Sequence, residues 1–126
     1  MWNAAVPDEA RAISEIRRAA HDHLVDEGLT EVDDLDAITV MVSELVTNAI
    51  CHGAQPVSIT VSAGPEIVRV EVRDGSTSLP RVLGLDPERV GGNGMRIVDI
   101  MSSSWGVDPA SAGKSVWFEV SRQTVA

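Results

Sequence analysis

The spacing of apolar residues changes abruptly midway along the chain, and this change constrains the fold more than any other feature. Residues 35–50 carry apolar side chains at helical spacing, on a stripe of Leu35, Ile38, Val42, Leu45, Val46, Ala49 and Ile50. Gly53 ends this pattern, and Pro56 marks the break. The segments 57–62 and 68–73 then alternate apolar with polar residues on either side of a Gly-Pro turn. We therefore predict a long amphipathic helix followed by an antiparallel hairpin with one solvated face.

The flanking segments extend this order on both sides. A helical pattern opens at Pro7 and stops at Gly28. After the hairpin we predict, in order, an irregular loop region at 74–94, a helix at 95–101, a strand at 104–107, a turn at 108–113 and a strand at 115–121. Because short turns join neighbouring strands, the sheet should be mixed and largely antiparallel, with helices covering one face. The predicted fold is a two-layer α/β sandwich.

Size and charge argue against several classes of protein. A chain of 126 residues has the length of one domain, so we expect a single domain over residues 1–126. The formal net charge of −9 disfavours direct binding to nucleic acid, because an acidic protein repels phosphate backbones. No apolar run approaches the roughly 20 residues that cross a bilayer. The N-terminus does not resemble a signal peptide, and the single cysteine, Cys51, cannot form an internal disulfide. We therefore expect a cytoplasmic protein without membrane attachment, in which Cys51 is a small buried residue.

Glu44, Asn48 and His52 follow one another at intervals of four within the predicted long helix. Residues at this spacing share a face, so Glu44 and Asn48 should project together beside the apolar stripe. A carboxylate can accept a proton from a hydroxyl group, and an amide oxygen is a suitable ligand for Mg²⁺. Polar residues are also common at the boundary of an amphipathic helix. The helix by itself favours neither interpretation.

Two glycine-containing segments border the predicted loop region. Asp74 and Gly75 follow the second hairpin strand, where an aspartate is an ordinary turn residue, although its carboxylate could also accept a hydrogen bond from the N6 amine of adenine. Residues 91–94, Gly-Gly-Asn-Gly, precede the helix that starts at Met95. Such a segment forms either a structural turn or a loop whose backbone N–H groups face a phosphate. It matches neither a Walker A loop nor a dinucleotide fingerprint.

Gly113-Lys114-Ser115 lies just before the last predicted strand. Taken alone, this segment is best interpreted as a hairpin turn.

In order along the chain, four segments resemble the ATP-binding domain of the gyrase, histidine-kinase and chaperone ATPase superfamily, the Bergerat fold. These segments are 44–53, 70–75, 92–98 and 113–118. Within the superfamily, the chain is most similar to the anti-sigma-factor serine kinases of Gram-positive bacteria, especially the short actinomycete members. The resemblance extends from about the first helix to Val120.

The resemblance implies a role for each matching residue. Glu44 matches the general base of the kinase members, and Asn48 matches the Mg²⁺ ligand that bridges the phosphates. Asp74, followed by Gly75, matches the aspartate that binds the adenine amine. The other matches belong to the phosphate-facing loop, to the end of the long helix or to the adenine hydrogen-bond network: Gly92, Asn93, Gly94, Met95, His52 and Ser115.

The activity implied by the resemblance is transfer of a phosphoryl group from Mg-ATP to a serine of a small antagonist protein. The same chain would bind and silence a sigma factor, and members of the family often form homodimers. The segment 80–91 matches the nucleotide lid but is short. A short lid favours an alternative, in which the chain holds ATP or ADP as a switch and regulates a protein partner without turnover.

Overall fold

The computed structural model describes residues 1–77 and 94–122 of the chain. This part of the chain contains strands and helices in the order β1 (Trp2–Val6), α1 (Arg11–Asp26), α2 (Val32–His52), β2 (Val57–Ala63), β3 (Ile67–Asp74), α3 (Gly94–Met101), β4 (Ser104–Ala110) and β5 (Gly113–Ser121).

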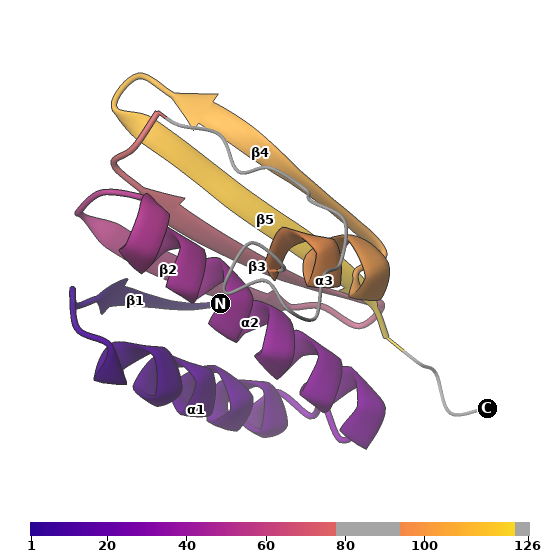
Figure 1. Cartoon of the computed structure of the whole chain (residues 1–126). Coiled ribbons are helices and arrows are strands. Elements are labelled where there is room, and N and C mark those ends of the chain that lie inside the picture. Colours follow the sequence, from indigo (N-terminus) through magenta and orange to yellow (C-terminus); the bar gives the residue numbers. More distant parts are fainter. Residues whose placement is uncertain (78–93, 123–126) are drawn as a thin grey trace, which may run out of the picture.

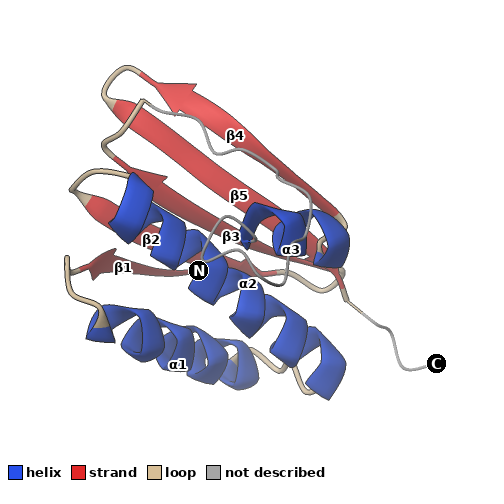
Figure 2. Ribbon diagram, in the orientation of Figure 1, coloured by secondary structure: helices blue, strands red, loops and turns tan. Residues whose placement is uncertain are grey.

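The strands form one sheet in the order β1-β2-β3-β5-β4 (Figure 1). The helices lie together on one face of this sheet, as Figure 2 shows. The predicted two-layer α/β sandwich is therefore confirmed. Each pairing between described strands is antiparallel, so the described sheet contains no parallel pair.

The core lies between α2 and the helix-facing side of the sheet. Alternate residues of β3 and β5 point toward the helices, so that Val70 and Phe118 are paired and fully buried. From α2, Ile38 and Val42 enter the same core. Helix α2 lies between α1 and α3 and runs across the sheet (Figure 1). The apolar stripe that predicted this helix is thus the stripe that it buries.

The ends of several elements differ from the sequence prediction. The order predicted from the sequence contains no strand before the first helix, but Trp2–Val6 forms β1 by pairing with β2. Strand β4 continues through Ala110, where a turn was predicted, because residues 108–110 pair with β5. The turn itself is confined to residues 111–112.

The burial predicted for Cys51 is wrong. Its side chain is exposed at the last turn of α2, because Cys51 lies on the opposite side of the helix from the buried stripe.

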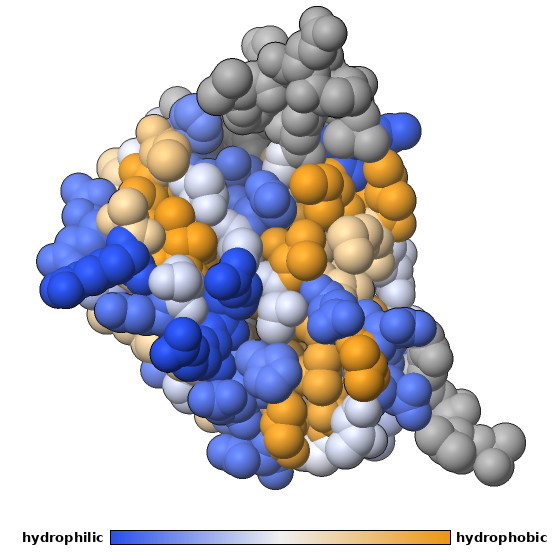
Figure 3. All heavy atoms as spheres, turned by 60° about the horizontal axis from the view of Figure 1, so that its bottom comes forward, coloured by the Kyte–Doolittle hydropathy of each residue, from blue (hydrophilic) through white to orange (hydrophobic). Residues whose placement is uncertain are grey.

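Apolar side chains also reach the surface, where Figure 3 shows them interspersed with hydrophilic groups. Val32 and Ile100 are the most exposed of these within the elements, at 66% and 56%. Scattered apolar residues of this kind are ordinary on the surface of a folded protein.

Candidate functional site

Two polar side chains of α2 lie on one face because they are four residues apart. Glu44 and Asn48 are both half-buried at the edge of the apolar stripe. Burial raises the pKa of the Glu44 carboxyl above its ordinary value of 4.5, because desolvation disfavours the charged form. A carboxyl group with a raised pKa holds a proton more readily, which suits a group that accepts a proton during a reaction.

The first residue of α3 lies against these two side chains. A β-carbon placed on Gly94 would be 2.6 Å from Oε2 of Glu44 and 3.6 Å from Nδ2 of Asn48. Glycine therefore allows the start of α3 to approach α2, and Met95 is buried beside it. The first N–H groups of a helix have no partner within the helix, and they form a natural site for an anion. In this protein such a helix start lies next to a carboxyl and an amide.

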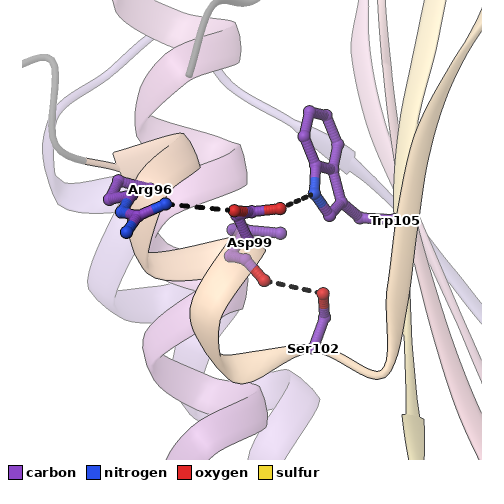
Figure 4. Close-up of polar contacts among 5 residues, drawn as sticks. Arg96, Asp99, Ser102 and Trp105 are labelled. Atoms are coloured by element: carbon purple, nitrogen blue, oxygen red, sulfur yellow. Dashed lines mark hydrogen bonds and ion pairs between the residues drawn. The ribbon is translucent and has the colours of Figure 1, made fainter. Parts of the chain in front are cut away.

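Polar contacts link α3 to β4 and also join residues within α3 and at its end (Figure 4). The indole Nε1 of Trp105 donates a hydrogen bond to Oδ1 of Asp99 at 2.9 Å, and Arg96 pairs with Oδ2 of the same carboxylate at 3.3 Å. At the end of the helix, the Ser102 hydroxyl donates to the carbonyl of Val98 at 2.6 Å. Of these three contacts, the Trp105–Asp99 hydrogen bond is the one that joins α3 to the sheet, and the other two stabilise the helix itself.

The carboxylate of Asp74 lies at the end of β3 and is buried. Its Oδ1 accepts a hydrogen bond from the backbone N–H of Ser76 at 2.7 Å. The same oxygen accepts one from the Lys114 ammonium at 3.0 Å, and both side chains of this ion pair are buried. Asp74 and Lys114 are direct partners in the register of β3 and β5, which explains why they meet on the same face.

Two glycines hold the segment after α2 against Asp74. The N–H of Gly53 donates to the carbonyls of Asn48 and Ala49, each at 3.1 Å, and so closes the helix. A β-carbon on Gly53 would lie 2.8 Å from Oδ2 of Asp74. The N–H of Gly75 donates to the carbonyl of Ala54 at 2.7 Å. The site thus has two halves, with Glu44 and Asn48 in one and Asp74 and Lys114 in the other. Gly53 connects them and lies about 7.5 Å beyond Asn48 along the helix axis.

The remaining predicted residues are not all brought together. The side chain of Ser115 lies on the opposite face of the sheet from Asp74, where its hydroxyl accepts a hydrogen bond from Nε of Arg73 at 3.3 Å. His52 is exposed at the end of α2. Gly92 and Asn93, like the proposed lid at 80–91, lie outside the described residues.

Lys114 is the residue of this cluster that the sequence analysis missed. The sequence predicts a turn for the motif that contains Lys114, and the resemblance points to Ser115 as its site residue. A usable signal was present, because a lysine followed by an alternating strand, Val116 to Val120, must point to the same face as the apolar residues of that strand. A charge on that face requires a buried partner.

The described residues contain no cluster of three or more histidine, cysteine, aspartate or glutamate side chains that could hold a metal ion. Within the same residues, no helix is both long enough and apolar enough to span a membrane.

The sequence profile of the family described as histidine kinase-like ATPase domain matches residues 6–119. The chain belongs to this family. The match includes all the site residues described above, on α2, β3, α3 and β5. Among curated proteins, no relative matches by sequence.

Solved structures show the same fold as this histidine kinase-like ATPase domain. One is the crystal structure of the RsbU and RsbW domains of Rv1364c from Mycobacterium tuberculosis, with a TM-score of 0.72 and 20% identity over 97% of this chain and 33% of that chain. Another is the histidine kinase domain of a blue-light activated histidine kinase from Erythrobacter litoralis EL346, with a TM-score of 0.55 and 21% identity over 87% of this chain and 59% of that chain. The chain thus spans about a third and about three fifths of these two proteins. At such identities the likeness establishes the fold alone.

Proposed function

We propose that the chain binds Mg-ATP and phosphorylates a serine of a small antagonist protein, while also sequestering a sigma factor. The observation that carries this proposal is the approach of Gly94 to Glu44 and Asn48. This approach brings the start of α3 next to the carboxyl of Glu44 and the amide of Asn48, in a chain of the histidine kinase-like ATPase family. The partner class comes from the resemblance of the sequence to anti-sigma-factor kinases.

The described residues fit the nucleotide in two places. A β-carbon at Gly94 would clash with Oε2 of Glu44, so glycine is what lets the N–H groups at the start of α3, a natural anion site, come close to Glu44 and Asn48. Asp74 supplies a buried carboxylate that can accept a hydrogen bond from the adenine amine. Mg²⁺ commonly takes only one or two protein ligands together with phosphate oxygens and water, so the amide of Asn48 would suffice on the protein side.

Glu44 is the residue that we assign to proton transfer. When bound, ATP supplies the phosphoryl group. Glu44 would take the proton of the serine hydroxyl as the serine oxygen bonds to the γ-phosphorus and the bond to the leaving ADP breaks. His52, Gly75, Gly92, Asn93 and Met95 remain predicted nucleotide contacts, whereas the side chain of Ser115 lies on the face of the sheet opposite Asp74 and is not assigned to the adenine.

A transfer assay tests the proposal. The protein is incubated with Mg²⁺, ATP labelled at the γ-phosphate and a candidate antagonist protein, and the label on the antagonist is counted. We expect transfer by the wild type and its loss in Glu44→Ala. Glu15→Ala is the matched control, since Glu15 is an exposed carboxylate on α1 and should leave transfer unchanged. Equal transfer by Glu44→Ala would remove Glu44 from the proposed mechanism.

The nucleotide switch without turnover is the second candidate, favoured by the short segment at 80–91. Titration with ATP and ADP distinguishes the two functions before any partner is known. Binding of both nucleotides without transfer to any antagonist supports the switch. A protein that binds neither nucleotide contradicts both candidates.

A further inference from the structure

The charged groups at the end of β3 form a pair rather than a single carboxylate. Asp74 and Lys114 are 96% and 95% buried, and the ammonium Nζ lies 3.0 Å from Oδ1. Lys114 is the only lysine in the sequence, and its side chain is buried although lysines seldom are. Taking an ammonium out of water is costly, so its burial at this place calls for a physical explanation.

The hydrogen-bonding capacity of the two groups supplies one. An ammonium carries three donors, and one of them goes to Oδ1 of Asp74. A carboxylate can accept about four hydrogen bonds, of which Oδ1 takes those from Lys114 and from the backbone N–H of Ser76. Beyond these contacts, the pair retains donor capacity on the ammonium and acceptor capacity on the adjacent carboxylate. The edge of a purine base offers the complementary arrangement, because in adenine the amino group at C6 is adjacent to the ring acceptor N1.

We propose that Lys114 is a specificity-determining residue that donates a hydrogen bond to N1 of adenine while Asp74 accepts one from the amino group. This inference rests on the proposed nucleotide binding and adds to it a second base-recognising side chain. The position of Lys114 supports the assignment. It is the register partner of Asp74 on the same face of the sheet, whereas the neighbouring Ser115 lies on the opposite face.

The pairing also alters how the site discriminates. A carboxylate alone would bind any ligand that donates a hydrogen bond to it. The ammonium beside it weakens the binding of a ligand that places a nonpolar group against it, because one N–H of the ammonium is then left without a hydrogen-bond acceptor. The site should consequently recognise the two adjacent positions of the base together.

Binding of ATP is compared with binding of 1-deaza-ATP, in which a C–H group replaces N1 and the amino group is kept. Both are titrated calorimetrically into the full chain. We expect the wild type to bind ATP at least about tenfold more tightly than 1-deaza-ATP, since a hydrogen bond from a charged donor is lost. In Lys114→Met the ratio of the affinity for ATP to the affinity for 1-deaza-ATP should fall to about one. An unchanged ratio in Lys114→Met, or tighter binding of ATP by that variant, overturns the proposal.

Two further measurements keep the test decisive if Lys114→Met does not fold. The double variant Asp74→Asn/Lys114→Met removes the unpaired buried charge, and its ratio should also be about one. In the wild type, lysine labelled with ¹³C at Cε gives one side-chain signal, because the chain has one lysine. That signal should shift with ATP and much less with 1-deaza-ATP, and equal shifts contradict the proposal. A wild type that binds neither nucleotide refutes the proposed function itself, whereas tight binding without discrimination refutes only the role of Lys114.

Discussion

The α-carbon of Gly53 lies so close to the carboxylate of Asp74 that a β-carbon there would be 2.7 Å from Cγ and 2.8 Å from Oδ2. Gly53 is the C-cap of α2, and Asp74 is the last residue of β3. The end of the helix that carries Glu44 and Asn48 is thereby fixed against the buried carboxylate. The two halves of the candidate site are joined by a contact that only glycine permits.

Replacing Gly53 with alanine should destabilise the fold. The added β-carbon would also lie 2.5 Å from the carbonyl oxygen of Ala49, and neither this backbone atom nor the buried carboxylate can move freely. We expect a loss of about 1–3 kcal/mol in the free energy of unfolding, as for other overpacked sites. Urea denaturation measures this loss. Gly64→Ala, in the turn between β2 and β3, is the control, and an equal loss there would contradict the explanation.

Replacing Gly94 with alanine should impair nucleotide binding more than stability. The new β-carbon would meet Oε2 of Glu44, the end of a flexible side chain that can rotate away. We therefore expect a change of less than about 1 kcal/mol in unfolding free energy, since alanine also favours the helix. Affinity for ATP should fall by about tenfold or more, because Glu44 is displaced and the space beside Asn48 is filled. Calorimetric titration gives the affinity, and unchanged binding would place the phosphates elsewhere.

Removing the cation of the buried ion pair should be costly. Lys114→Met leaves Asp74 as a buried charge, and we expect a loss of about 3–5 kcal/mol in unfolding free energy. In Asp74→Asn/Lys114→Met no charge remains, so the double variant should be more stable than Lys114→Met. Arg96→Met breaks the half-exposed pair with Asp99 and should cost less than about 1 kcal/mol. A double variant less stable than Lys114→Met would argue against charge burial as the cause.

Glu44→Gln should change the pH dependence of stability. Because burial raises the pKa of Glu44 above 4.5, the folded state retains its proton over a pH range in which the unfolded state has lost it. The contribution of Glu44 to stability therefore falls as the pH rises from 4.5 through the folded-state pKa. Glutamine removes this contribution. The stability of Glu44→Gln relative to the wild type should rise over the same range and then level off.

Urea denaturation between pH 4 and pH 7.5 tests this expectation. The exposed Glu15 provides the comparison through Glu15→Gln, which should follow the wild type more closely. A pH profile of Glu44→Gln parallel to that of the wild type would show that Glu44 is not desolvated.

The elements with strong periodicity were predictable from the sequence. The apolar stripe of α2 and the alternation in β2 and β3 arise from local spacing, and they also placed Glu44 beside Asn48. The strand β1 was absent from the predicted order because its short sequence carries little pattern, and it is defined by its pairing with β2 about 55 residues away.

The sequence by itself determined which residues share a helix face or a strand face, because those relationships depend on periods of 3.6 and 2. Only the tertiary structure decided which faces meet. The register between β3 and β5 places Lys114, rather than Ser115, opposite Asp74, over a sequence separation of 40 residues. A shift of one residue would exchange their faces, and pairing of distant strands is fixed by packing of the whole sheet rather than by the residues of either strand.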